Sequence, residues 1–272
     1  MSSPGGESRG DTTAGASGGV LPVALVVPLY NEQDRLGAFV AAVEALVGGS
    51  LCPGLMLQEV VLVDDGSTDK TPALLAELAA RADWTVVPAC PGTHGKGNAI
   101  ARGAAAASAP FLLLSDVDLA APLSEASKLA DALTAGAAIA IGSRDVAGSS
   151  VTAPLSRVIT GRAFNALVRA VTGLPVKDTQ CGFKLLPLDL ARTLLSSLLV
   201  SGLAFDVELL LRARAGGHRV AEVPIRYHHG ELSTVRPVFD AGRMAKDVVR
   251  LAIRMRLRPF LSRSRRDAGA NG

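Results

Sequence analysis

The segment Phe111-Leu112-Leu113-Leu114-Ser115-Asp116-Val117-Asp118 decides the fold of this chain. Its apolar first half predicts a buried strand, and the two carboxylates after it are expected in a cleft at the carboxyl end of that strand. Two neighbouring buried carboxylates repel each other and need a counter-charge. Mg²⁺ or Mn²⁺ would supply that charge and keep positions open for a phosphate. An isolated Asp-x-Asp also fits a solvated turn, so the rest of the chain has to decide.

Short apolar runs alternate with helical patterns on both sides of that segment. Strands are expected at 23–28, 59–63, 85–88, 110–114, 138–141 and 220–225, and helices at 34–47, 71–82, 98–107, 123–135, 155–172 and 204–215. The alternation predicts an α/β fold of Rossmann-like type, a mostly parallel sheet flanked by helices, with ligands at the carboxyl ends of the strands.

Polar segments follow four successive predicted strands. They are Pro28-Leu29-Tyr30-Asn31-Glu32, Asp64-Asp65-Gly66-Ser67-Thr68-Asp69, Gly92-Thr93-His94-Gly95-Lys96-Gly97-Asn98 and the acid pair itself. The second suits a tight turn whose carboxylates accept bonds from a base or a ribose, although an ordinary helix-capping turn is the alternative. Lys96 in the third is placed to neutralise a pyrophosphate. That loop lacks the Walker pattern, and a plain surface loop fits it equally well.

Charged side chains continue beyond the strand at 138–141. Arg144, Arg157 and Arg162 suit bidentate contacts with phosphate, although structural ion pairs would explain each of them equally well. Asp206 and Glu208 stand in the first turn of an apolar helix, where the helix dipole alone favours an acid.

Composition excludes several classes of protein. Of 272 residues, 49% are apolar and 19% charged, which is typical of a globular protein with a substantial core. Cys52, Cys90 and Cys181 are too few and too far apart for a disulfide framework or a Cys-ligated zinc, and they fit a reducing compartment. No apolar run reaches the roughly 18 to 20 residues of a spanning helix, so we expect a chain that does not cross a membrane.

The two ends differ from the central domain, which we place at 20–238. Residues 1–19 and 264–272 are expected to be disordered tails. Residues 239–263 predict a basic amphipathic helix, which suits an anionic membrane surface. Its apolar face carries Met244, Val248, Leu251 and Met255, and its cationic flank Arg243, Arg250, Arg254 and Arg258. A helix packed on the domain with solvated arginines is the alternative, and the lack of interleaved aromatic residues argues against nucleic acid as a partner.

In their order along the chain, these motifs resemble the family 2 glycosyltransferases of the GT-A fold. Within that family the chain is most similar to the polyprenyl-phosphate (dolichyl-phosphate) hexose synthases, the β-glucosyltransferase and mannose synthase group. The resemblance runs from about Val23 to Leu251. It is carried by the four strand-end segments, Gly142-Ser143-Arg144, Asp178-Thr179-Gln180-Cys181-Gly182-Phe183-Lys184, Phe205-Asp206-Val207-Glu208-Leu209 and Val223-Pro224-Ile225.

The resemblance implies a metal-dependent, inverting hexosyltransferase. The donor would be a nucleotide-diphosphate sugar, with UDP-glucose preferred and GDP-mannose as the alternative, and the acceptor a polyprenyl or dolichyl monophosphate. The donor would be held by Pro28, Tyr30, Asn31, Glu32, Asp64, Asp65, Gly66, Lys96 and Asp116, and the Mg²⁺ or Mn²⁺ by Asp116 and Asp118. Asp118, Asp206 and Lys96 would be catalytic, and Arg144, Arg157, Arg162 and Arg236 would bind the acceptor phosphate.

This chain departs from the family pattern at two positions. Thr234 stands where relatives carry the Lys of a Ser-Lys pair near the acceptor, and Ala120 stands where some relatives carry a Gln that binds the metal. The resemblance and the basic helix together predict a peripheral protein on the cytoplasmic face of a membrane. The competing hypotheses are a GT-A enzyme with a soluble acceptor, a sugar-phosphate nucleotidyltransferase, and a non-catalytic membrane scaffold.

Overall fold

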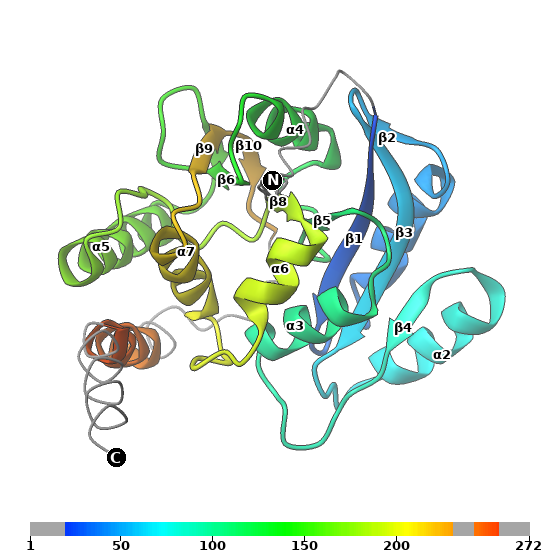
Figure 1. Ribbon diagram of the computed structural model, residues 1–272. Coiled ribbons are helices and arrows are strands. Elements are labelled where there is room, and N and C mark those ends of the chain that lie inside the picture. The colour runs from blue at the N-terminus through cyan, green and yellow to red at the C-terminus, as the bar shows by residue number, and fades with distance from the viewer. Residues whose placement is uncertain (1–19, 231–241, 256–272) are drawn as a thin grey trace, which may run out of the picture.

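The computed structural model describes residues 20–230 and 242–255, and its centre is an eight-stranded sheet (Figure 1). The strands follow the order β2-β3-β1-β5-β8-β6-β9, with β4 paired to β3. Their bounds are β1 (Leu21–Leu29), β2 (Ser50–Cys52), β3 (Leu55–Asp64), β4 (Thr85–Val87), β5 (Phe111–Leu114), β6 (Ile139–Ser143), β8 (Lys184–Pro187) and β9 (Val220–Pro224). A separate two-stranded pair joins β7 (Ser150–Thr152) and β10 (Arg226–His228).

Most neighbouring strands are parallel, as the sequence predicts. β1 pairs in parallel with both β3 and β5, β3 with β4, and β6 with β9. Two strands run the other way: β2 lies at one edge, and β8 lies in the middle between β5 and β6. The parallel strands therefore open their carboxyl ends on one edge of the sheet, which is where the polar segments of the sequence are found.

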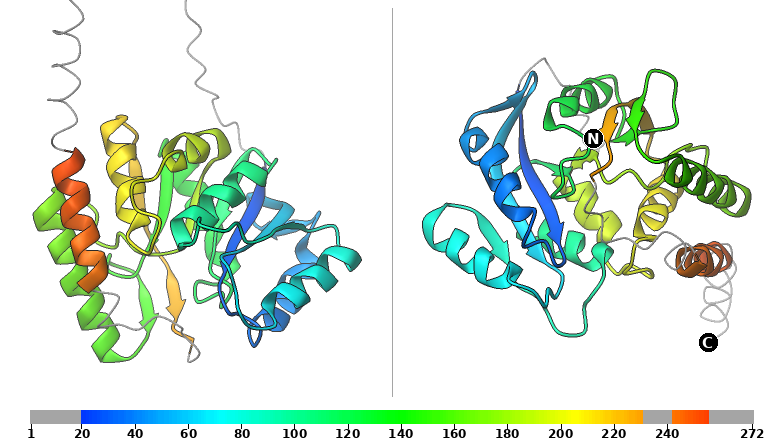
Figure 2. Two further views of the ribbon diagram at one scale, coloured as in Figure 1. Left: turned by 90° about the horizontal axis from the view of Figure 1, so that it is seen from below. Right: turned by 180° about the vertical axis from the view of Figure 1, so that it is seen from behind.

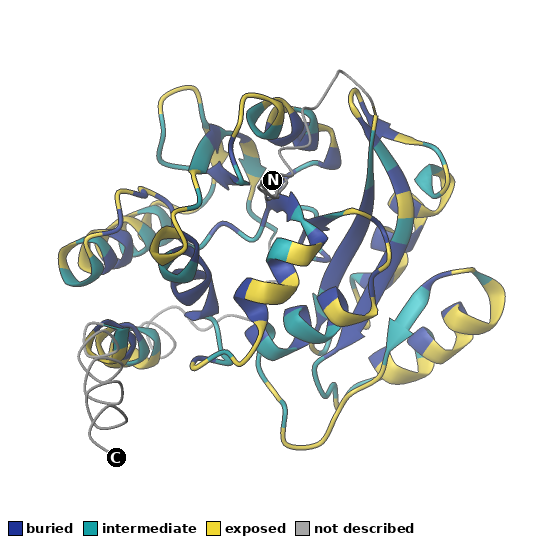
Figure 3. Ribbon diagram, in the orientation of Figure 1, coloured by how far each residue is buried: buried dark blue, intermediate teal, exposed yellow. Residues whose placement is uncertain are grey.

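Helices cover both faces of the sheet. They are α1 (Leu36–Val43), α2 (Thr71–Arg81), α3 (Lys96–Ala106), α4 (Ala126–Thr134), α5 (Leu155–Thr172), α6 (Leu188–Leu195), α7 (Phe205–Ala215), the 3-10 turns η1 (Glu44–Leu46) and η2 (Leu123–Glu125), and a helix over 242–255. Alternate residues of β1 face opposite sides. Val23, Leu25 and Val27 pack with α1, α2 and α4, whereas Ala24 and Val26 pack with α3, α5, α6 and α7. The central strands β1, β5, β6 and β8 are accordingly mostly buried, and the helices expose their outer faces (Figure 3).

The predicted strands and helices are all present, with small differences in their bounds. The sequence patterns did not predict β2, β7, β8, β10 and α6. The strands among them are only three or four residues long, too short for a period of two to emerge. β8 also begins with Lys184, a residue type that is depleted in strands.

The helix over 242–255 lies beside α5 (Figure 2). Its apolar stripe is packed on the domain: Val248 and Leu251 are buried, and Met244 and Met255 pack against the same core. The apolar stripe therefore faces the protein core and not a membrane. This agrees with the second of the two hypotheses, a helix packed on the domain. The exposed face carries Arg243, Lys246, Val249, Arg250, Ile253 and Arg254.

Several predictions fall outside the described residues. These are the two tails at 1–19 and 264–272, the acceptor residue Arg236 and the last part of the basic helix, including Arg258. Within 20–230 and 242–255, every helix is too short or too polar to cross a membrane.

Candidate active site

The loops after β1 and β3 are joined to each other at the carboxyl edge of the sheet. The backbone N–H of Asn31 donates to Oγ of Ser67 at 3.0 Å, and Oδ1 of Asn31 accepts the N–H of Thr68 at 2.8 Å. Asn31 has a φ of 55°, in the left-handed region that Asn tolerates. Its side chain thus shapes the two loops, while Tyr30 beside it is half-exposed at the rim.

The loop before α3 meets the same edge through Asp65. Both oxygens of Asp65 accept the backbone N–H of Gly95, at 2.8 and 3.0 Å. Burial raises the pKa of Asp65, and the Gly95 N–H opposes that shift. Gly66 has a φ of 89°, and a Cβ there would collide with the ring of His94, so Gly is required for two reasons. Asp64 supports this turn by accepting the N–H of Ser67 at 3.0 Å.

Asp116, at the end of β5, is balanced by Lys96 at the start of α3. Nζ of Lys96 lies 2.6 Å from Oδ1 of Asp116. Burial alone would raise the pKa of Asp116, but the Lys96 ammonium outweighs it and holds that pKa below its usual value. Gly182 lies against the same carboxylate, since a Cβ built on it would be 2.5 Å from Oδ2 of Asp116. Asp116 is therefore ionised and confined between Lys96 and the backbone of Gly182.

Asp118 stands in a different environment. Burial and then the charge of Asp116 raise its pKa. Its Oδ1 accepts the N–H of Ala120 at 3.1 Å, and Nη1 of Arg35 lies 4.0 Å from its Oδ2. Arg35 is in turn held by Glu32, at 2.6 Å from Nη2 to Oε1, and burial raises the pKa of Glu32 to about 7. The sequence analysis missed Arg35, because an arginine at the start of a predicted helix gives no signal of its partners.

The donor atoms present fit a hard divalent cation. Asp116 and Asp118 line one pocket together with Ala120, Phe183 and Tyr227, and the Lys96 ammonium provides the positive charge that the pair requires. In the part of the chain that the structure describes, no cluster of three His, Cys, Asp or Glu side chains is suited to a metal. A cation here would need oxygens from the donor diphosphate or water to complete its ligand shell.

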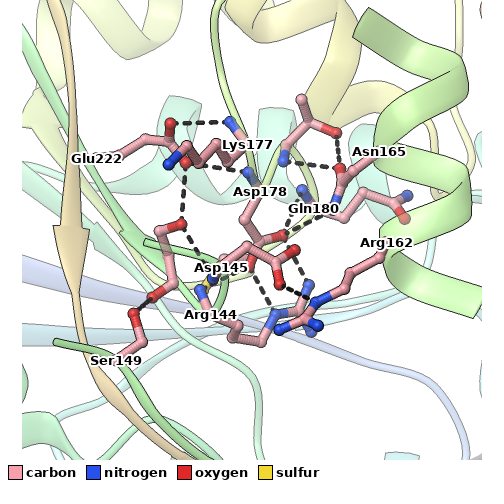
Figure 4. A network of polar contacts seen from close by, with 12 residues as sticks. Arg144, Asp145, Ser149, Arg162, Asn165, Lys177, Asp178, Gln180 and Glu222 are labelled. Atoms are coloured by element: carbon pink, nitrogen blue, oxygen red, sulfur yellow. Dashed lines mark hydrogen bonds and ion pairs between the residues drawn. The ribbon is translucent and has the colours of Figure 1, made fainter. Parts of the chain in front are cut away.

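Arg144 lies next to the same pocket and is held in one orientation. Its Nε and Nη2 donate to Oδ2 and Oδ1 of Asp178 at 2.7 and 2.8 Å (Figure 4). Its guanidinium also lies 5.1 Å from the ring centroid of Tyr227. Asp178 is fully buried, yet Arg144 overcomes the effect of burial and lowers the pKa of Asp178. Tyr227 also lines the pocket of the acid pair, so Arg144 contacts a residue of the pocket lining.

A polar network fastens the segment around Asp178 to its surroundings (Figure 4). Glu222 of β9 accepts the backbone N–H groups of Lys177 and Asp178 at 2.8 and 3.0 Å. Asn165 of α5 accepts from both the N–H and the hydroxyl of Thr179, at 3.0 and 2.8 Å. The orientation of Arg144 is therefore fixed by α5 and β9 together.

The other arginines predicted to bind the acceptor phosphate are placed differently. Arg162 points outward, is 67% exposed along its side chain and bonds Asp145 at 2.9 Å. Arg157, in the first turn of α5, is close enough to His229 to lower the pKa of that ring, after the larger effect of burial. The charge of Arg144 reaches the acid pair and helps to lower the pKa of Asp116, whereas Arg162 forms a surface ion pair.

Asp206 is buried in the first turn of α7, where its Oδ1 lies 2.6 Å from Nζ of Lys184. Burial raises the pKa of Asp206, and Lys184 opposes that shift. The predicted role of Asp206 as a catalytic group stays a prediction. Lys184 belongs to a motif that the sequence analysis singled out, but no role was assigned to it.

An open, mostly parallel sheet with an acid pair and joined loops at its carboxyl edge has the architecture expected of a GT-A glycosyltransferase. The model of the family "Glycosyl transferase family 2" matches residues 24–193, and the chain belongs to that family. It is 33% identical over 248 residues to dolichyl-phosphate beta-glucosyltransferase of Drosophila melanogaster, covering 86% of this chain and 75% of that protein. The corresponding Dictyostelium discoideum enzyme is 30% identical over 242 residues, covering 85% and 74%.

Solved structures agree on the fold. Glucosyl-3-phosphoglycerate synthase from Mycobacterium tuberculosis, crystallised with Mn²⁺ and UDP-glucose, superposes with a TM-score of 0.62 at 21% identity. The alignment covers 84% of this chain and 77% of that one. At this identity the likeness concerns the fold alone, and it confirms the predicted GT-A architecture.

Proposed function

We propose that this protein transfers glucose from UDP-glucose to a polyprenyl or dolichyl monophosphate, with inversion, giving a β-linked lipid-phosphate sugar. One observation carries the proposal: an acid pair balanced by Lys96 shares a pocket wall, Tyr227, with an arginine locked by Asp178. The donor diphosphate would thus bind at the acid pair and the acceptor phosphate at Arg144, with Tyr227 next to both. The names of the relatives, dolichyl-phosphate beta-glucosyltransferases, support the same donor sugar and acceptor.

The donor would lie across the loops after β1 and β3. Asp65, held by Gly95, and Glu32, next to Arg35, would accept hydrogen bonds from hydroxyl or N–H groups of the nucleoside, with Tyr30 at the rim. Pro28, Asn31, Asp64 and Gly66 would act by shaping these loops. When bound to Asp116 and Asp118, Mg²⁺ or Mn²⁺ would neutralise the charge of the diphosphate leaving group.

The proposed reaction does not need a strong general base. A lipid monophosphate is largely ionised near pH 7, so its oxygen is already a nucleophile. That oxygen forms the new bond to the anomeric carbon while the bond from this carbon to the diphosphate oxygen breaks, and the nucleoside diphosphate departs. The protein aligns the two groups and balances charge, with Arg144 and Arg157 on the attacking phosphate and Lys96 on the leaving group.

Access to a lipid substrate would come from a peripheral membrane position on the cytoplasmic side. The exposed face of the helix over 242–255 supports this, because it combines four cations with Val249 and Ile253, which are 40% and 55% exposed. Such a surface is attracted to anionic headgroups, and each basic residue near the membrane contributes roughly 1 kcal/mol.

The test is a panel of UDP-glucose and GDP-mannose against two acceptors, a short-chain polyprenyl phosphate and 3-phosphoglycerate, with Mn²⁺ or Mg²⁺. Glycolipid from UDP-glucose supports the proposal. Product with 3-phosphoglycerate alone would instead support an enzyme with a soluble acceptor, the alternative that the sequence left open. If no donor yields glycolipid, the proposed function is wrong.

A further inference from the structure

Lys184 is a fully buried lysine in the centre of the sheet. It lies on β8, opposite Leu114 of β5 and Ile141 of β6. An ammonium group removed from water is costly unless it is paired, and an apolar residue would suit an interior strand better. The reaction proposed above gives Lys184 no role, so its partners are informative.

The ammonium of Lys184 contacts two groups, a carboxylate of α7 and a backbone carbonyl near Asp116. Its Nζ lies 2.6 Å from Oδ1 of Asp206, and it also donates a hydrogen bond to the carbonyl oxygen of Cys181. Cys181 precedes Gly182, whose backbone lies against the carboxylate of Asp116. Lys184 therefore supports both the N-terminus of α7 and the backbone that confines Asp116.

The N-termini of α7 and α3 are in direct contact. The N–H of Gly97 donates to the carbonyl of Ser201 at 2.7 Å, and a Cβ on Gly97 would lie 2.6 Å from Cβ of Phe205. Lys96 precedes Gly97 and Asp206 follows Phe205, and these two charges attract each other. Lys96 thus has two anionic groups that act on it, Asp116 at 2.6 Å and Asp206, which the contact between the two helix N-termini brings near.

This arrangement matters when a cation binds. A divalent ion on Asp116 and Asp118 would compete with Lys96 for the same carboxylate and repel its ammonium. Asp206 is the anion that remains for Lys96. Resting on the proposed function, we propose that Lys184 and Asp206 are positioning residues that keep Lys96 in the pocket when the metal displaces it from Asp116, so that its ammonium meets the donor diphosphate.

The test compares two variants with a matched control. Lys184→Met/Asp206→Leu removes the pair as a whole, a replacement that is often neutral for stability. Asp206→Asn keeps the shape and removes only the anion. The control is Glu208→Gln, two residues further along α7, whose ion pair with Arg212 at 2.5 Å is also buried but whose carboxylate faces residues 199–200. Binding of UDP in the presence of Mn²⁺ is measured by calorimetry, melting temperature by scanning fluorimetry, and kcat with UDP-glucose.

Both variants should raise the Kd for UDP with Mn²⁺ about tenfold and lower kcat by at least as much, because Lys96 is no longer held near the diphosphate. Glu208→Gln should leave that Kd unchanged even where its melting temperature falls. If Asp206→Asn and the folded double variant bind UDP with the affinity of the wild type, the positioning role is overturned. It is also overturned if Glu208→Gln loses as much affinity for UDP as these two variants do. If the expected Kd changes occur while the wild type makes no glycolipid, the proposed function fails and the positioning role stands.

Discussion

Replacing Gly182 by Ala tests whether the position of Asp116 controls the reaction. The added Cβ would lie 2.5 Å from Oδ2 and 3.0 Å from Cγ of Asp116. Ordinary van der Waals contact begins at 3.4 Å, so the carboxylate has to move by about 0.9 Å. Gly182 is not among the described glycines with a positive φ, so Ala fits the backbone and the fold should survive.

The substitution is therefore expected to lower the activity without lowering the stability of the fold. A displacement near 1 Å in a positioned group costs about 10²-fold in rate, or roughly 2.7 kcal/mol of transition-state stabilisation. Initial rates with UDP-glucose and polyprenyl phosphate across a Mn²⁺ titration should show this loss together with weaker apparent Mn²⁺ affinity. The melting temperature should stay close to that of the wild type.

The matched control is Gly37→Ala on α1, where a Cβ meets open space. Because Ala favours an exposed helix over Gly by up to about 1 kcal/mol, this variant should be at least as stable as the wild type and equally active. A Gly182→Ala enzyme with a rate within threefold of the wild type, and an unchanged Mn²⁺ response, would refute the reasoning.

Three further outcomes are expected. Lys96→Met removes the largest charge that lowers the pKa of Asp116 and leaves only the smaller effects of Lys184 and Arg144 against burial, so the acid limb of the pH–rate profile should move to higher pH, with kcat about 10²-fold lower. An unmoved limb would contradict this. Glu32 stays protonated in the folded state up to pH about 7, against 4.5 when unfolded, so the folded protein binds more protons between these values and loses stability as the pH rises through them. Glu32→Gln should abolish that loss, about 3 kcal/mol between pH 4.5 and 7.5 in urea unfolding, and an equal slope in both proteins would count against it. Arg144→Lys cannot reproduce the two bonds to Asp178, so the KM for the lipid phosphate should rise about tenfold while the Kd for UDP stays constant.

Local patterns predicted the strand ends well. The runs that form β1, β3 and β5 are apolar and end in polar residues, and parallel strands collect such ends at one edge whatever the details of the fold. For this reason Asp65, Lys96, Asp116 and Asp118 could be grouped before any coordinates were known. The same rule predicted the mostly parallel sheet.

Partnerships across the fold could not be predicted in this way. Asp178 is 34 positions from Arg144, and Asp206 is 22 positions from Lys184, so neither pair has a local signature. The helix over 242–255 shows a different limit. An apolar stripe fits a membrane and a protein core equally well, and only the burial of Val248 and Leu251 decides between the two.

The central position of β8 also sets an order of events during synthesis. β5 and β6 belong to one sheet only because β8 lies between them, and the register joins Leu113 to Leu185. A ribosome that has made β1 to β6 has therefore produced the sheet of β1 to β5 and one strand, β6, whose partners β8 and β9 have not yet been made. Contacts so distant in sequence form slowly because loop closure must come first. Asp116 acquires its Gly182 wall in the same step. The pocket of the acid pair therefore cannot form before β8 and then Tyr227 of β10 have been made, and a nascent chain that ends before β8 carries both aspartates without that pocket.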